Sequence, residues 1–209
     1  MTLRGRTRRR YAAVLDPAGE RLATAHRDGY AFLWDAVVAE GLAASARRLR
    51  CLRGHGGAVV ACGWSADGRR VATASKDRTA RVWGAKTGNE LATLAHPCRC
   101  AAVALRGYAV ATAAFDGIVR LWNVAPEKEK DAVRVDFSPE EESAWSSHLA
   151  AARPGHRGRA TSLAFDAAGK TLVSAGFDRA AIGWDADSCL ALGLADDDDR
   201  TVAATVATG

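Results

Sequence analysis

The chain has 209 residues, of which 48% are hydrophobic and 25% charged, a balance typical of a globular domain with a buried core. Its first ten residues, MTLRGRTRRR, lack the apolar segment of a secretory signal, and no apolar run reaches the length of about 18 residues that a membrane helix needs. We therefore expect an intracellular protein, cytoplasmic or nuclear, whose Arg-rich start is a solvated edge of the fold.

Charge is divided unequally along the chain. Basic residues exceed acidic ones by ten in residues 1–100, and acidic residues exceed basic ones by five in residues 101–209, which gives the net charge of +5. A basic N-terminal half attracts anionic partners over a long range. Nucleic acid is one hypothesis for the partner, but we expect no interleaving of basic and exposed aromatic residues, and no nucleic-acid-binding motif is present.

The first predicted unit begins with a strand near Tyr11. Thr24, Asp28 and Trp34 follow one another at intervals of four and six residues. Next comes an insertion whose Ala-rich first half predicts a short helix and whose end, residues 48–52, predicts an outer strand.

The second unit, residues 54–97, is the most regular part of the sequence. Turn-forming pairs of residues divide it into four short runs with strand composition, residues 59–64, 71–75, 79–83 and 90–94. The pattern predicts a four-stranded antiparallel meander. Within it, Thr73, Asp77 and Trp83 repeat the spacing of the first unit.

The same spacing occurs twice more, at Thr112, Asp116 and Trp122 and at Ser174, Asp178 and Trp184. Four copies of one spacing indicate a repeat protein, because each copy marks one supersecondary unit.

A second insertion separates the third unit from the fourth. Within residues 126–154, the segment 131–137 predicts an outer strand, and residues 138–142, SPEEE, have the composition of a helix start. The predicted helix would carry Trp145 and Leu149 on one side. We expect Trp145 either to pack on the edge of the fold or to dock a partner.

The four units resemble the WD40 repeat family, whose repeats of about 40 to 45 residues begin with Gly-His and end with Trp-Asp. The terminal dipeptide is Trp34-Asp35, Trp83-Gly84, Trp122-Asn123 and Trp184-Asp185. The resemblance implies an all-β protein, a WD40-type β-propeller with four recognisable blades plus one strand of a fifth. A single domain, residues 1–209, would then contain repeats at residues 5–53, 54–95, 96–154 and 155–195, and a partial fifth at 196–209.

The family resemblance also implies a hydrogen-bonded set within each blade, in which His, Ser or Thr, Asp and Trp contact one another. The complete sets would be His55, Thr73, Asp77 and Trp83, and His156, Ser174, Asp178 and Trp184. The first copy contributes Thr24, Asp28 and Trp34, and the third copy contributes Thr112, Asp116 and Trp122. His is unevenly placed, because Arg6 stands at its aligned position in the first copy and His96 lies only sixteen residues before Thr112.

Ser, His and Asp together also occur in hydrolase triads. A triad is a single constellation, whereas this pattern recurs beside a Trp each time, so we interpret the sets as structural. We expect no enzyme activity, because no nucleophile elbow, paired metal-ligand motif or phosphate-binding loop is present.

Five cysteines occur without paired spacing, which favours reduced thiols. His96, Cys98 and Cys100 lie close together, but no second pair of ligands matches them. We therefore predict no metal site and no cofactor.

The C-terminal residues predict an incomplete ring. Residues 189–194 suit an outer strand, the acidic run 196–199 stands where the next unit would start, and residues 201–206 suit the inner strand of a fifth blade. Four blades are fewer than most WD40 rings contain, so we expect a fragment of a longer protein or a chain that associates with itself through exposed blade faces.

The family resemblance implies a non-catalytic scaffold for protein–protein interaction, an adaptor or subunit of a larger complex. In WD40 proteins the residue just before the turn Asp lies near the entrance where partners bind, which suggests Arg27, Lys76, Phe115 and Phe177 here. Two basic and two aromatic residues suit an acidic protein or peptide with an apolar anchor. The alternative is a nucleic-acid-associated module that uses the basic N-terminal half.

Overall fold

A computed structural model describes residues 10–36, 47–126, 145–166, 168–186 and 191–196 of the protein. In these residues every regular element is a β-strand, which confirms the all-β prediction. Accordingly, no helix in the described part is long and apolar enough to span a membrane.

The strands form four antiparallel sheets of four strands each, and every sheet is a meander of consecutive strands. Sheet 1 contains β1 (Arg10–Leu15), β2 (Arg21–His26), β3 (Ala31–Asp35) and β4 (Arg48–Leu52). Sheet 2 contains β5 (Val59–Trp64), β6 (Arg70–Ser75), β7 (Thr79–Gly84) and β8 (Glu90–Ala95). Sheet 3 contains β9 (Cys100–Arg106), β10 (Ala109–Ala114), β11 (Ile118–Pro126) and β12 (Trp145–Pro154). Sheet 4 contains β13 (Ala160–Phe165), β14 (Thr171–Gly176), β15 (Ala180–Asp185) and β16 (Ala191–Asp196).

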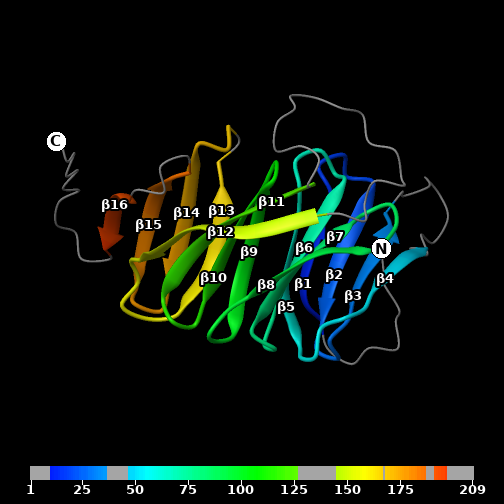
Figure 1. The fold of residues 1–209 in the computed structure, drawn as a ribbon, viewed down its shortest axis with the longest axis horizontal. Helices are drawn as coiled ribbons and strands as arrows, with labels where there is room; N and C mark the ends of the chain where they lie inside the picture. Colours follow the sequence, from blue (N-terminus) through cyan, green and yellow to red (C-terminus); the bar gives the residue numbers. More distant parts are fainter. Residues whose placement is uncertain (1–9, 37–46, 127–144, 167, 187–190, 197–209) are drawn as a thin grey trace, which may run out of the picture.

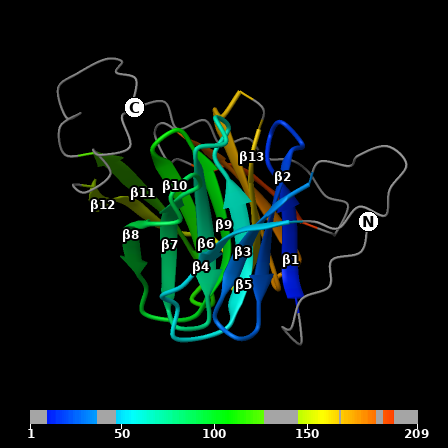
Figure 2. The same ribbon diagram turned by 90° about the vertical axis from the view of Figure 1, so that its right-hand side faces the viewer.

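The four sheets follow one another in chain order across the molecule, with sheet 1 and sheet 4 at opposite ends (Figure 1). The first strands of neighbouring sheets lie next to each other, β1 beside β5, β5 beside β9 and β9 beside β13. On the outer side, β12 of sheet 3 lies alongside β8 of sheet 2 (Figure 2). This succession of four-stranded blades is the propeller arrangement that the repeat pattern predicts.

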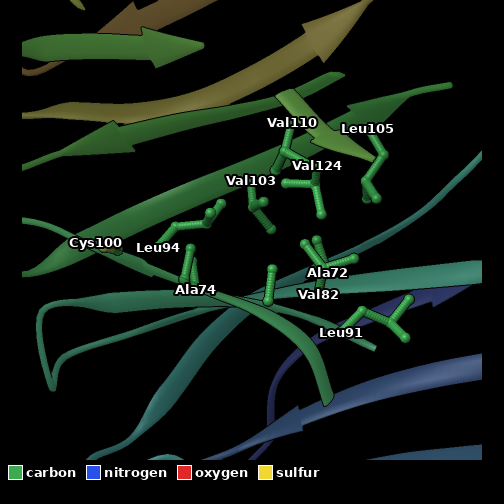
Figure 3. Close-up of a cluster of buried hydrophobic side chains, with 12 residues drawn as sticks. Ala72, Ala74, Val82, Leu91, Leu94, Cys100, Val103, Leu105, Val110 and Val124 are labelled. Atoms are coloured by element: carbon green, nitrogen blue, oxygen red, sulfur yellow. The ribbon is translucent and has the colours of Figure 1, made fainter. Parts of the chain in front are cut away.

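Strands in the middle of the molecule are buried on both faces, because sheets 2 and 3 each pack between two other sheets. Every residue of β6 is buried, with Val71 in the cluster shared with sheet 1 and Ala72 in the cluster shared with sheet 3. Figure 3 shows the second of these clusters, in which side chains of sheet 2 such as Val82 and Leu94 meet Val103 and Val110 of sheet 3. Small and branched side chains at these positions let the sheets approach closely.

Polar groups also join sheet 1 to sheet 2. The Arg21 guanidinium pairs with Asp16 at 2.8 Å, donates to the Gly68 carbonyl at 2.7 Å and lies 4.8 Å from the centre of the Trp64 ring. The Trp64 indole N–H in turn donates to the Val14 carbonyl at 3.0 Å. One arginine therefore satisfies buried polar groups of two sheets while it covers an aromatic ring.

The second of the two insertions differs from the sequence prediction, whereas the first agrees with it where the structure describes the chain. The outer strand of sheet 1 is found at residues 48–52 as predicted, and the helix expected before it falls in residues 37–46, outside the described part. In sheet 3 the prediction of a helix that carries Trp145 and Leu149 is wrong. These residues lie in β12, which pairs antiparallel with β11.

The segment forms β12 and no helix because pairing with a neighbouring strand outweighs local helix propensity. Extending β11 to Pro126 offers the following chain a long edge, and Pro126 pairs with Trp145 at its end. The segment 131–137, predicted as the outer strand, lies outside the described residues, and β12 takes that place. The outer strand of sheet 4 is β16 at Ala191–Asp196, two residues later than the predicted 189–194.

The outward faces of the end sheets are not alike. On sheet 4, Val173 is 43% exposed, whereas the equivalent residues of sheets 1 to 3, Ala23, Ala72 and Ala111, are 0% exposed. On sheet 1, Phe32 and Trp34 are buried. The expectation of an exposed apolar face therefore describes sheet 4 and is wrong for these two residues of sheet 1. The strand expected at residues 201–206 lies outside the described residues.

Candidate functional site

The indole N–H of one Trp in each sheet donates to a hydroxyl on the neighbouring strand. The bonds join Trp34 to Thr24, Trp83 to Thr73, Trp122 to Thr112 and Trp184 to Ser174, each at 2.8 Å. The hydroxyl residues are all 0% exposed. In sheet 2 the register explains the contact, because Thr73 pairs with Arg81 and the Trp two residues further is its diagonal neighbour on the same face.

Sheets 2 and 4 contain all four residue types of the predicted set in contact. In sheet 2 the His55 ring lies 2.8 Å from Thr73 through Nε2 and 2.8 Å from Asp77 through Nδ1. In sheet 4 the corresponding distances from His156 are 2.8 Å to Ser174 and 3.0 Å to Asp178. Because a carboxylate only accepts, Nδ1–H donates to Asp and Nε2 accepts from the hydroxyl.

Burial and hydrogen bonds set the charge states in sheet 2. Burial lowers the pKa of His55 and outweighs the opposing effect of Asp77. Burial would raise the pKa of Asp77, but hydrogen bonds from Thr79 and His55 lower it below its ordinary value. A neutral imidazole beside an ionised carboxylate is the state that completes the chain of donors from Trp83 to Asp77.

In sheet 1 the histidine that contacts the equivalent hydroxyl comes from a different place in the chain. The histidine is His26, on the same strand as Thr24 and two residues after it, and its Nε2 lies 2.8 Å from the Thr24 hydroxyl. Asp28 is exposed, and its carboxylate accepts from the backbone N–H of Tyr30 at 3.3 Å. Aligning the first copy with the others placed Arg6 at the histidine position, so the sequence prediction missed His26. The available signal was the spacing of His26 from Thr24, because residues two apart on a strand lie on the same face.

In sheet 3 the histidine contacts the hydroxyl as in sheet 2, but the aspartate pairs with a different side chain. His96 accepts at Nε2 from Thr112, at 2.8 Å, and donates from Nδ1 to the Leu94 carbonyl at 3.0 Å. Asp116 instead forms an ion pair with Arg120 at 2.6 Å. The prediction that Asp116 completes a set like that of sheet 2 is therefore wrong, because a nearby guanidinium binds a carboxylate more strongly than a neutral imidazole does.

All these histidines and aspartates lie at one end of the sheets, which we call the His–Asp end. It comprises the β2–β3, β6–β7, β10–β11 and β14–β15 turns and the connections between successive sheets. The four residues predicted to bind a partner lie in these turns: Arg27, Lys76 and Phe177 are exposed, and Phe115 is half-buried. The opposite end carries the β1–β2, β5–β6, β9–β10 and β13–β14 turns.

Cations and aromatic rings are interleaved at the His–Asp end, contrary to the expectation from the sequence. Lys76 lies 5.5 Å from the centre of the Tyr11 ring, and Arg53 lies 5.7 Å from that of Tyr30. Arg159 of sheet 4 lies 4.6 Å from the centre of the Phe115 ring of sheet 3. Residues from different sheets form two of these pairs, so their proximity was invisible in the linear sequence.

The side chains of His96, Cys98 and Cys100 do not gather into a group that could hold a metal ion. Both ring nitrogens of His96 are engaged, and burial raises the pKa of the Cys100 thiol to about 12. No group of three potential metal-binding side chains gathers anywhere in the described residues. The described cysteines are free thiols, and Cys189 lies outside the described part.

Comparison with known families agrees with this architecture. The model of the WD domain, G-beta repeat, matches residues 46–84, 88–123 and 148–185, which together make up more than half of the chain. The chain belongs to the WD40 repeat family. The matched segments do not include residues 10–35, where sheet 1 nevertheless contains the Trp34 to Thr24 bond of the other WD40 blades.

Among solved structures, that of U3-55K resembles the chain with a TM-score of 0.69 and 20% sequence identity. The match covers 93% of this chain and 54% of U3-55K, so the WD40 chain spans about half the length of that protein. At this identity the likeness shows the fold alone. A search of curated protein sequences gives no match.

The shared hydroxyl should be important for the stability of a WD40 blade. Thr73→Val keeps the shape of the side chain but leaves the Trp83 N–H and the His55 ring without their partner, and we expect it to lower the free energy of unfolding by about 1–3 kcal/mol. Thr93→Val, on the exposed face of β8, is the matched control and should change it by less than about 0.5 kcal/mol. Equal effects in denaturant titrations would contradict the role of Thr73.

His96 should make stability depend on pH. Burial lowers its pKa from 6.5 to about 4, so below pH 6.5 the unfolded chain binds a proton that the folded chain does not. Stability should therefore fall as the pH falls from 6.5 towards 4, by about 2 kcal/mol between pH 7 and pH 5 from this residue. His96→Gln should reduce the pH dependence of unfolding by that amount, and an unchanged dependence would contradict the assignment.

Proposed function

We propose that the chain is a non-catalytic WD40 scaffold, an adaptor or subunit of a larger intracellular complex, that binds a protein partner at its His–Asp end. The main support is the distribution of charge there. The carboxylates of Asp77, Asp116 and Asp178 are bound within their own sheets. Asp28 accepts from a backbone N–H and is exposed, as are the cations Arg27 and Lys76. This end therefore offers cations and aromatic rings to a partner.

The buried positions of the hydroxyl groups argue against catalysis. Thr73 and Ser174 are 0% exposed, and each contacts both a Trp and a His. A nucleophile must reach the reacting atom of a substrate, and these oxygens are covered by the neighbouring sheet. The repeated Ser/Thr, His and Asp residues thus serve the fold, and the exposed side chains around them are the candidates for binding.

A second candidate is a nucleic-acid-associated module that uses the basic N-terminal half. It is favoured by the pairs of Lys76 with Tyr11 and of Arg53 with Tyr30, since proteins that bind single strands combine basic grooves with aromatic side chains. Both candidates use the same end of the sheets, so one experiment compares them.

Capture of partners from an extract of the source cells tests the proposal. The double variant Lys76→Glu, Phe177→Ala should retain at most about a tenth of the captured protein, because it reverses a charge and removes an exposed ring at the His–Asp end. The control is Lys170→Glu, Leu15→Ala, which reverses a charge and truncates a large apolar side chain at exposed residues of the opposite end. Nuclease treatment should leave the captured proteins in place. Loss of capture after nuclease would favour the nucleic-acid alternative, and equal capture by both variants would exclude this end.

The exposed face of sheet 4 supports self-association as a further property of the scaffold. Its Val173 occupies a position that the next sheet covers in sheets 1 to 3, and exposed apolar sheet faces tend to associate. Light scattering should detect dimers that persist at high salt and disappear in Val173→Lys. Association that weakens with salt would instead indicate attraction between the charged ends of the sequence, and a monomer at all concentrations would contradict both.

A further inference from the structure

Phe177 is the most exposed large apolar side chain in the described residues, with 74% of its surface in solvent. It stands in the β14–β15 turn at the His–Asp end, and its backbone N–H donates to the Arg159 carbonyl at 2.9 Å. The backbone bond fixes where the ring emerges although little covers the ring itself. An exposed but positioned aromatic side chain is the usual anchor of a binding surface.

Arg159 connects this ring to a second one. Its guanidinium lies 4.6 Å from the centre of the Phe115 ring, and the backbone N–H of Phe115 donates to the Arg99 carbonyl at 3.0 Å. We define the Phe177 patch as Phe115, Arg157, Arg159, Phe177 and Arg179. The patch spans the boundary between sheets 3 and 4. Phe115 comes from the β10–β11 turn of sheet 3, Arg157 and Arg159 from the β12–β13 connection, and Phe177 and Arg179 from the β14–β15 turn of sheet 4.

The carboxylates beside the patch are bound by groups outside it or by backbone N–H groups, and not by the patch guanidinium groups. Asp178 accepts from His156 and from the backbone N–H groups of Arg157 and Ala180, and Asp116 pairs with Arg120. Within the described part of the chain, no ion pair involves the exposed guanidinium groups of the patch. An anionic ligand would therefore meet arginines for which no carboxylate of the described residues competes.

Arg179 lies at a turn position that has left-handed backbone in every sheet. Its φ is 62°, the equivalent Arg78 of sheet 2 has φ of 72°, and Gly29 and Gly117 of sheets 1 and 3 have φ of 87° and 75°. Glycine would fit this turn without strain. In sheet 4 the arginine at this position adds a guanidinium to the turn that carries Phe177.

We propose that the Phe177 patch binds an acidic peptide in which carboxylate side chains flank one aromatic or large aliphatic residue. The carboxylates pair with the arginines, and the apolar residue packs on the Phe177 ring. The proposal rests on the proposed function and specifies the chemistry of the partner at that same end of the WD40 sheets.

The arrangement of the rings favours a peptide over a single-stranded nucleic acid. A cation of the protein already lies over Tyr11, Tyr30 and Phe115, and among the described residues none lies over Phe177. Single strands gain affinity from several bases that stack on several open rings. One open ring with arginines in its own turn and in the adjacent connection suits one apolar anchor with acidic neighbours.

Fluorescence anisotropy with defined probes tests the proposal on the full chain. The probe is a short labelled peptide with the core Asp-Glu-Phe-Glu-Asp, and its relatives replace Phe by Ala or the acids by their amides. Both relatives should bind at least about tenfold more weakly than the probe. A labelled single strand of thymidine nucleotides of similar charge should also bind more weakly.

Variants of the protein locate the site. Phe177→Ala and Arg159→Glu should each weaken binding of the probe by about tenfold or more, while Leu15→Ala and Lys170→Glu at the opposite end stay within about twofold. Arg179→Gly removes a cation and relieves the left-handed backbone, so it should weaken binding without lowering the melting temperature. This variant separates binding from stability.

Three results would overturn the proposal: no saturable binding of the probe, binding that is insensitive to the patch variants, or tighter binding of the thymidine strand with loss in the same variants. The last result would assign the patch to nucleic acid. If the probe fails but capture from extract still depends on Lys76 and Phe177, the scaffold function stands and only the acidic chemistry of the partner is wrong. If capture is independent of both residues, the His–Asp end is not the interaction site.

Discussion

The bond from a buried indole N–H to a buried hydroxyl is the interaction on which each blade depends. It joins the second and third strands of all four sheets at the same distance. The bonded Trp also packs against the neighbouring sheet: Trp83 lies in the cluster with Ala23 and Leu33 of sheet 1, and Trp184 with Ala111 of sheet 3. One polar contact therefore fixes both the position of a large ring within its sheet and the surface that the sheet presents to its neighbour.

The histidine on the far side of the hydroxyl is also present in every sheet, but it arrives from different places. It lies in the connection before sheets 2, 3 and 4 and on a strand in sheet 1. What the hydroxyl requires is an acceptor at one point in space, and several backbone routes supply it. The aspartate is the variable member, because its carboxylate lies near solvent, where an arginine or a backbone N–H can replace the imidazole.

The partners of the turn aspartates also affect which charged groups the His–Asp end exposes. Carboxylates bound to His55, Arg120 and His156 are withdrawn from interaction with ligands. The cations in the same turns remain exposed, and some of them cover aromatic rings of the neighbouring sheet. The hydrogen bonds that stabilise the blades thus also occupy the acceptor atoms of these carboxylates, while the cations beside them stay exposed.

The sequence alone determined the repeat and the strands of the second unit to within a residue at each end, because these depend on local spacing that each unit repeats. The resemblance of that repeat to the WD40 family implied the all-β fold and the residues of two complete sets. Only the tertiary structure decided the rest. The residues around Trp145 became a strand because β11 offered them an edge, and Asp116 turned to Arg120 because the strand brings the two side chains together. The pairing of Arg159 with Phe115 depends on how two sheets meet, and no spacing within one repeat encodes that contact.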